Sequence, residues 1–292
     1  MTKTLKTPTP PQAPPITPAT VVATAAVTTA ATPSTGPTTA AFEACRNLNL
    51  TGLAPELETL CAHAIKQRLS YPAFLTEALT IEIDIRHERR RQRRVLEAKL
   101  PRIKTLDTFD LTANPLISPH TIALLRDGTY IDNSEPVVLL GNSGAGKSHL
   151  LIAACLAAAE NGRRVRYTTC AQHPNELCEA KDDNHLGRVV QKYGRYDLLA
   201  IDELGYVHLD TRSAELLFQI LTEREERASI AIASNAPFSE WTKTFTDTRL
   251  AAAVIDRITY KAHIIETGTN SYRLAGLHLI SCNRIRFCSD HI

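Results

Sequence analysis

The stretch Gly141-Asn142-Ser143-Gly144-Ala145-Gly146-Lys147-Ser148 follows the apolar run Val137–Leu140 and opens an apolar helical pattern over Lys147–Glu160. It matches G-x-x-x-x-G-K-[ST], a loop that binds phosphate between a strand and a helix. The glycines allow backbone N–H groups to point at phosphate oxygens, and the dipole of the following helix favours negative charge. A glycine-rich turn without a ligand would have no need of Lys147 followed by Ser148. The stretch therefore predicts a phosphate-binding loop.

Two side chains of this loop have expected tasks. Lys147 should reach the β- and γ-phosphates of a bound nucleotide, and Ser148 should give its hydroxyl to Mg²⁺. We therefore expect ATP and Mg²⁺ as cofactors. The residues predicted to bind the nucleotide are Gly141, Asn142, Ser143, Gly144, Ala145, Gly146, Lys147 and Ser148, together with Asp202 from the second half of the site.

The second half of the site is expected at Asp197-Leu198-Leu199-Ala200-Ile201-Asp202-Glu203, an apolar strand that ends in two acids. Asp202 should hold Mg²⁺ directly or through water, and Glu203 should polarise the attacking water. Such a pair can also be a solvated turn, but the phosphate loop upstream argues against that reading. The spacing leaves room for a strand at Arg164–Thr168 between the two motifs, which favours the additional-strand class of ATPases over small-molecule kinases.

A polar residue is expected between the acidic pair and the γ-phosphate. The strand Ile230–Ser234 ends just before Asn235, which is the first candidate for this sensor position, with Ser234 the second. The alternative is an Asn-Ala-Pro turn in which Asn235 serves only the backbone.

The helical segment Thr248–Tyr260 carries two arginines, Arg249 and Arg257. Either could be an ordinary surface residue. An oligomeric ATPase, however, needs an arginine that reaches the γ-phosphate of a neighbouring subunit and stabilises charge in the transition state. Arg257 is the better candidate for that role.

Apolar strands alternate with helical patterns beyond Pro136, which predicts an α/β fold with a parallel sheet covered by helices on both faces. The expected strands are Val137–Leu140, Arg164–Thr168, Leu198–Ile201, Ile230–Ser234 and His263–Glu266, and the expected helices are Lys147–Glu160, Leu186–Tyr193, Ser213–Arg227 and Thr248–Tyr260. We divide the chain into a disordered Thr/Ala/Pro-rich leader (1–40), a helical N-terminal domain (41–104), the ATPase domain (105–275) and a tail (276–292).

Charge and cysteine content limit the partners. The chain has 33 Lys+Arg against 31 Asp+Glu, so any affinity for nucleic acid must come from local clusters. The densest cluster lies at the end of the helical domain, and its arginines are Arg86, Arg89, Arg90, Arg91, Arg93 and Arg94. This run can bind DNA phosphates, or it can be a solvated face or a partner site. Scattered cysteines and the absence of a long apolar run predict a cytoplasmic protein with reduced thiols and no membrane span.

Taken together, these motifs resemble the IstB-like ATP-binding proteins, the transposition helpers of insertion sequences, and their relatives the DnaC helicase loaders. The resemblance extends beyond the nucleotide motifs and runs from about Leu48 to Leu274. The further matching stretches are Leu69–Leu75, Leu106–Asp110, Arg164–Thr169, Ile201–Tyr206, Ala214–Gln219, Ser234–Trp241 and Ser271–Arg273. The leader and the tail lie outside the pattern, and the phosphate loop lacks the Gly-Pro-Pro-Gly-Thr-Gly-Lys-Thr that is common in the family.

The resemblance implies an AAA+ ATPase without the usual helical lid domain. It also implies that the protein assembles on double-stranded DNA in an ATP-dependent manner and recruits or activates a transposase. Arg257 would be the arginine finger, and Arg273 would be a late sensor residue that contacts the nucleotide.

We therefore expect an ATP-hydrolysing, DNA-binding transposition helper that works as a homo-oligomer with a transposase encoded by the same element. One alternative is a helicase loader whose helical N-terminal domain grips a replicative helicase. The other is a DNA scaffold that binds ATP without hydrolysing it, and Glu203 argues against it because a pure binder needs no water-activating carboxylate.

Overall fold

The computed structural model describes residues 37–170, 186–206, 209, 211–245, 247–269 and 272. Its contacts divide the chain into two compact units, Met1–Ser70 and Tyr71–Ile292. Within the described residues, no helix is long and apolar enough to cross a membrane. Cys45, Cys61, Cys155 and Cys170 are free thiols.

The first unit contains two helices, α1 (Pro37–Asn47) and α2 (Leu53–Gln67), which pack on each other. The buried residues of α2 are Leu53, Leu57 and Leu60, at helical spacing. The last residues assigned to the disordered leader, 37–40, belong to α1, and the rest of that leader lies outside the described residues.

The second unit begins with α3 (Tyr71–Glu97), a helix of 27 residues that carries the basic run. It packs on α6 and β2, and its end is joined to the sheet because the Tyr167 N–H donates to the Ala98 carbonyl over 3.0 Å. Ala98 is completely buried. The division at Ser70/Tyr71 therefore groups α3 with the sheet, whereas the sequence placed a boundary after residue 104.

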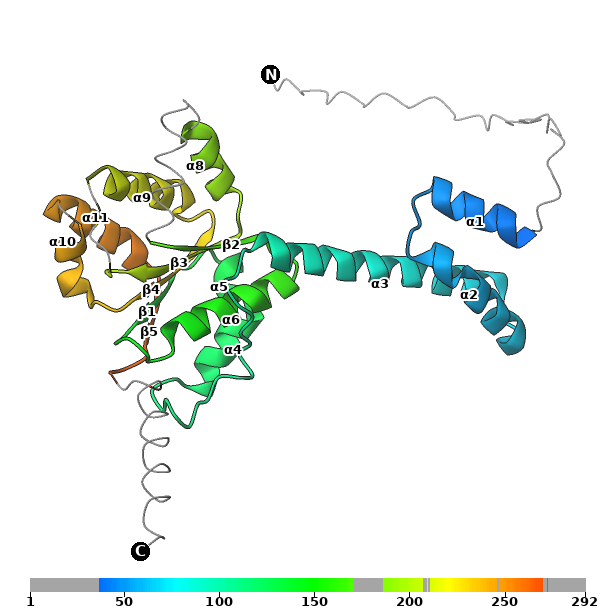
Figure 1. Cartoon of the computed structure of the whole chain (residues 1–292), viewed down its shortest axis with the longest axis horizontal. Coiled ribbons are helices and arrows are strands. Elements are labelled where there is room, and N and C mark those ends of the chain that lie inside the picture. Colours follow the sequence, from blue (N-terminus) through cyan, green and yellow to red (C-terminus); the bar gives the residue numbers. More distant parts are fainter. Residues whose placement is uncertain are drawn as a thin grey trace, which may run out of the picture. The chain divides into compact units, whose positions relative to one another are not determined.

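The core of the second unit is a parallel sheet of five strands in the order β2-β3-β4-β1-β5 (Figure 1). The strands are β1 (Val137–Leu140), β2 (Val165–Thr169), β3 (Leu198–Leu204), β4 (Ser229–Ser234) and β5 (His263–Glu266). All five predicted strands are present. Because β4 lies between β1 and β3, the strand of the phosphate loop and the strand of the acidic pair are not neighbours. This is the additional-strand arrangement that the spacing predicted.

Helices cover both faces of the sheet (Figure 1). One face packs with α6 and the shorter helices before β1, and the other packs with α9, α10 and α11. The helices are α4 (Pro119–Asp127), α5 (Thr129–Asp132), α6 (Lys147–Glu160), α8 (Leu186–Gly194), α9 (Thr211–Arg224), α10 (Trp241–Thr244) and α11 (Thr248–Thr259), with a 3₁₀ turn η1 (Phe238–Glu240). Alternate strand residues serve opposite faces, since Val137 and Leu139 join one core and Val138 the other. The fold class predicted from the sequence, a P-loop NTPase of the AAA+ type, is confirmed. The prediction that the protein lacks a helical lid domain concerns residues 273–292, which lie outside the described residues.

Candidate nucleotide site

A pocket of about 570 Å³ lies where β1, β3 and β4 end. The carboxyl edge of a parallel sheet is the usual place for a ligand in such folds. The pocket brings together predicted residues from three separate motifs, which are Ser143, Gly144, Ala145, Gly146, Lys147, Ser148, Asp202, Glu203 and Asn235. Gly141 and Asn142 form the start of the same loop, between β1 and these residues.

The phosphate loop has the backbone shape that its glycines permit. Gly146 has φ 95°, and a Cβ there would lie 2.8 Å from Phe109 Cε2. A Cβ on Gly141 would lie 2.7 Å from the Gly268 carbonyl oxygen. The Lys147 side chain is only 8% exposed, and its Nζ donates to the Asn142 carbonyl over 2.8 Å. The lysine is thus folded over the loop, where its charge can meet phosphate oxygens.

A β-bulge in β3 sets the positions of Asp202 and Glu203. Ile201 is paired with Ile232 and Leu204 with Ser234, so β3 has one more residue than β4 in this interval. Glu203 has φ 62°, a left-handed conformation that is uncommon for a residue with a side chain. Bulges next to active sites re-aim side chains. Here the bulge leaves Asp202 buried and Glu203 exposed at the pocket.

Asp202 is held by hydrogen bonds on both carboxylate oxygens. The Tyr167 hydroxyl on β2 donates to Oδ2 over 2.7 Å, and the Glu203 N–H donates to Oδ1 over 2.8 Å. Asp202 and Ser148 are hard oxygen donors in the same pocket, and Mg²⁺ prefers one or two such ligands together with substrate phosphates. The residues present therefore fit Mg²⁺ bound with a nucleotide.

Asn235 and Ser234, the two sensor candidates, have different environments. The Ser234 hydroxyl donates to the Ala236 carbonyl over 2.9 Å and accepts from Trp241 Nε1 over 3.2 Å, so it fixes the turn after β4. Asn235 Oδ1 is buried and has no hydrogen-bond partner among the residues that the structure describes. Because Asn235 lines the pocket, its unused oxygen favours it over Ser234 as the sensor.

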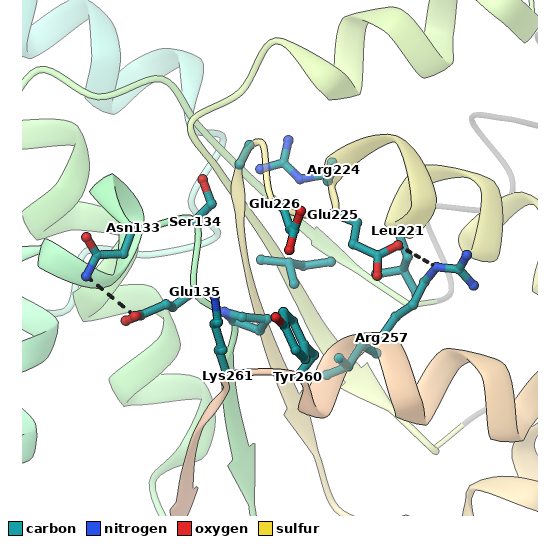
Figure 2. A pocket seen from close by; sticks show the side chains of 14 residues that line it. Asn133, Ser134, Glu135, Leu221, Arg224, Glu225, Glu226, Arg257, Tyr260 and Lys261 are labelled. Atoms are coloured by element: carbon teal, nitrogen blue, oxygen red, sulfur yellow. Dashed lines mark hydrogen bonds and ion pairs between the residues drawn. The ribbon is translucent and has the colours of Figure 1, made fainter.

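Arg257 lies away from this pocket. It is near the end of α11, which runs back toward the amino edge of the sheet, and it lines a second pocket there (Figure 2). Its Nε donates to Glu225 Oε2 over 2.9 Å, and its guanidinium lies 4.3 Å from the centre of the Phe218 ring. Arg249, at the start of α11, is also absent from the nucleotide pocket. Arg273 is outside the described residues.

Four arginines of the basic run form an exposed stripe on one face of α3, whereas Arg94 is half-buried. Arg86, Arg89, Arg90 and Arg93 follow the i, i+3, i+4, i+7 spacing that places side chains on one helix face. The ion pairs within the helix are Arg86–Glu82 (2.6 Å), Arg91–Glu88 (3.0 Å), Arg93–Glu97 (3.7 Å) and Arg94–Glu97 (2.9 Å). The Arg91–Glu88 and Arg93–Glu97 pairs join exposed side chains and contribute little stability. The Arg86 pair is different, because the Glu82 side chain is only 4% exposed and Arg86 neutralises a buried carboxylate.

The sequence did not predict that residues from the segment before β1 form part of the pocket wall. Asn114 Nδ2 donates to the Ala145 and Thr267 carbonyls over 3.1 and 2.9 Å, and so joins the phosphate loop to the segment after β5. His149 Nε2 lies 3.1 Å from the Thr105 carbonyl oxygen. Burial lowers the pKa of His149, so its ring is neutral at neutral pH. Leu106–Asp110 matched the family pattern, but no local signal placed it at the pocket.

The site and the strand order together define the class of protein. A phosphate loop after β1, an acidic pair at the end of β3 and an intervening β4 are the features of an additional-strand P-loop ATPase. A family model described as "IstB-like ATP binding protein" matches residues 43–278, which is most of the chain. The protein therefore belongs to the IstB-like ATP-binding family, as the sequence resemblance predicted, and ATP is the nucleotide that this family binds.

Two relatives found by sequence agree with this assignment. The chain is 36% identical over 227 residues to the "Insertion sequence IS21 putative ATP-binding protein" of Pseudomonas aeruginosa, covering 78% of this chain and 86% of that protein. It is 34% identical over 232 residues to the IS5376 counterpart of Geobacillus stearothermophilus, covering 80% and 92%. Among solved structures, the DnaC helicase loader matches with a TM-score of 0.46 and 17% identity, covering 56% of this chain and 95% of that one.

Proposed function

We propose that this protein is an AAA+ ATPase that assembles on double-stranded DNA and assists a transposase encoded by the same insertion sequence. The observation that carries the enzymatic part is the bulge in β3, which presents Glu203 to the pocket beside Asp202 and the phosphate loop. A protein that only binds ATP needs no such carboxylate. The names of the relatives, insertion-sequence ATP-binding proteins, support the biological context.

The residues of the pocket have the groups that phosphoryl transfer to water requires. Lys147 and the loop N–H groups bind the β- and γ-phosphates, while Ser148 and Asp202 would hold Mg²⁺, which neutralises phosphate charge when bound. Glu203 accepts a proton from the attacking water, and Asn235 Oδ1 orients that water beside the γ-phosphate. Catalysis here is chiefly positioning and electrostatic stabilisation.

Assembly is proposed because the fourth catalytic candidate, Arg257, lies at the opposite edge of the sheet from the nucleotide pocket of its own chain. It would therefore act on the ATP of a neighbouring copy, as the sequence analysis expected of an arginine finger. The exposed arginine stripe on α3 would contact DNA phosphates, with the strong salt dependence that such contacts show.

The test compares the wild-type chain with Glu203→Gln, which keeps the side-chain shape but removes the base. We expect duplex DNA to stimulate ATP turnover of the wild type. Glu203→Gln should lower turnover by roughly 10²–10⁴-fold and trap a large ATP-dependent complex on DNA, seen by sedimentation. Glu160→Gln, at the exposed end of α6, is the matched control and should behave as wild type. Unchanged turnover in Glu203→Gln, or a wild type that neither hydrolyses ATP nor assembles on DNA, would refute the proposal.

A further inference from the structure

Asn114 lies half-buried in the wall of the nucleotide pocket, 31 residues before the phosphate-loop residue that it contacts. Its Nδ2 donates to the Ala145 carbonyl over 3.1 Å and to the Thr267 carbonyl over 2.9 Å. Both neighbours are acceptors, so the NH₂ end of the amide, and not its oxygen, must face them. One side chain thus holds two carbonyl groups from distant parts of the chain.

Two turns fix the backbone of Asn114. Pro115 follows it, and the Ile117 N–H donates to the Asn114 carbonyl over 3.2 Å, which makes a β-turn with Asn first and Pro second. On the other side, Asp110 Oδ1 accepts from the Ala113 N–H over 3.2 Å. A residue before proline is also restricted to extended conformations. The amide is therefore held in place before any ligand binds.

The Thr267 carbonyl is a fixed reference point for this amide. Thr267 is 2% exposed and directly follows β5. Its N–H and its hydroxyl both donate to the Leu140 carbonyl at the end of β1, over 2.7 and 3.1 Å. Through Asn114, the Ala145 carbonyl is therefore tied to the edge of the sheet where β1 and β5 end.

The bond to Ala145 determines the direction of the next N–H group. The Ala145–Gly146 peptide is trans, so the Ala145 carbonyl and the Gly146 N–H point in opposite directions from one plane. The preceding carbonyl, that of Gly144, is held in a similar way by the Tyr272 N–H over 3.2 Å. Loop N–H groups bind the phosphate oxygens in this motif. A bond that fixes a loop carbonyl therefore also fixes the donor on the other side of its peptide plane.

We propose that Asn114 is a positioning residue for nucleotide binding, which holds the Ala145–Gly146 peptide so that the Gly146 N–H meets a β-phosphate oxygen. The proposal rests on contacts between loop N–H groups and phosphates, which are part of the proposed function, and not on hydrolysis or DNA binding. Asn114 acts through the loop and not on the phosphate itself. Without its two hydrogen bonds, phosphate binding must also order this peptide, which lowers the affinity.

The test is displacement of a fluorescent ATP analogue from the full chain by ATP, inorganic tripolyphosphate or adenosine. Asn114→Ala removes both hydrogen bonds and should weaken ATP and tripolyphosphate by on the order of tenfold. Adenosine has no phosphate, so its inhibition constant should stay close to that of the wild type. A residue that only supports folding would lower the number of binding sites and leave the ratio of these constants unchanged.

Asn161→Ala is the matched control. Asn161 Nδ2 also donates to a backbone carbonyl, that of Arg126 over 3.4 Å, but Asn161 is exposed after the end of α6 and does not line the nucleotide pocket. This variant should bind all three competitors as the wild type does. If Asn114→Ala does not fold, Asn114→Ser takes its place and should weaken the same two ligands. Serine also suits the first position of the turn, and its one O–H can donate to only one carbonyl.

The outcomes separate the positioning role from the proposed function. A wild type that binds neither ATP nor tripolyphosphate refutes the phosphate contacts, and with them the proposed function. A folded Asn114→Ala chain with wild-type constants for ATP and tripolyphosphate refutes the positioning role alone. Equal weakening of all three competitors, adenosine included, also refutes it, because Asn114 would then support the pocket as a whole.

Discussion

Replacing Tyr167 by Phe removes one hydroxyl from behind the proposed magnesium ligand and changes little else. Tyr167 lies on β2 beside β3, and its hydroxyl donates to Asp202 Oδ2 over 2.7 Å. Asp202 is 4% exposed, so water cannot easily replace the lost donor. Burial and the nearby Asp202 charge raise the pKa of Tyr167, so this hydroxyl keeps its proton and remains a donor at neutral pH.

The size of the effect follows from the type of bond. A hydrogen bond to a charged group contributes about 1.5–3 kcal/mol, which corresponds to roughly 10- to 150-fold in an equilibrium constant. Loss of a residue that orients a metal ligand usually weakens metal affinity by about 10- to 100-fold. We therefore expect Tyr167→Phe to raise the Mg²⁺ concentration for half-maximal binding of a fluorescent ATP analogue by roughly tenfold or more. Binding of the analogue in EDTA should change little.

Tyr130→Phe is the matched control for this experiment. The Tyr130 hydroxyl is buried and has no hydrogen-bond partner within the described residues, so its loss should not affect Mg²⁺ dependence. It should leave stability unchanged or raise it, because an unsatisfied buried hydroxyl is unfavourable. If Tyr167→Phe folds normally and its Mg²⁺ dependence equals that of Tyr130→Phe, then Tyr167 does not position Asp202 and the reasoning is wrong.

Two further predictions concern stability. Arg224 is 2% exposed as a residue, and its guanidinium donates to the carbonyls of Tyr193, Tyr196 and Ser229. Arg224→Met should lower the free energy of unfolding in urea by about 1–3 kcal/mol, because buried carbonyls lose their donor, and an unchanged or higher free energy would contradict this expectation. The pKa of His149 is lowered from 6.5, chiefly by burial, so the unfolded chain takes up this proton more readily. The free energy of unfolding should therefore fall as the pH drops through 6.5. His149→Gln should show a shallower decline in Tm over the same pH range. Equal declines in the variant and the wild type would contradict this expectation.

The strands were predictable because the information that specifies them is local. β1 and β5 have the predicted ends, since each is a short apolar run between residues that break the pattern. β3 was predicted to end at Ile201 and continues to Leu204. The difference is the bulge, which adds a residue and breaks the alternation that a sequence pattern can detect. Because a bulge leaves no periodic pattern, the sequence could not predict the backbone conformation of Glu203 at the centre of the site.

Contacts between distant segments were not predictable from one sequence. Asn114 and Thr267 are 153 residues apart, yet their hydrogen bond closes the phosphate loop against the segment after β5. Tyr167 and Asp202 are 35 residues apart and meet because β2 and β3 are neighbours. Register and strand order create such pairs, whereas each residue alone is an ordinary polar side chain.

The position of Arg257 connects the fold to the proposed assembly. In a parallel sheet with β4 inserted between β1 and β3, the phosphate loop, the acidic pair and the sensor all lie at the carboxyl edge. A helix that returns from β4 to the start of β5 must end at the opposite edge, so an arginine near its end faces away from its own nucleotide. Under the proposed function, hydrolysis then depends on contact between two chains. Within its own chain Arg257 pairs with Glu225 over 2.9 Å, so contact with a neighbouring copy would have to compete with this ion pair.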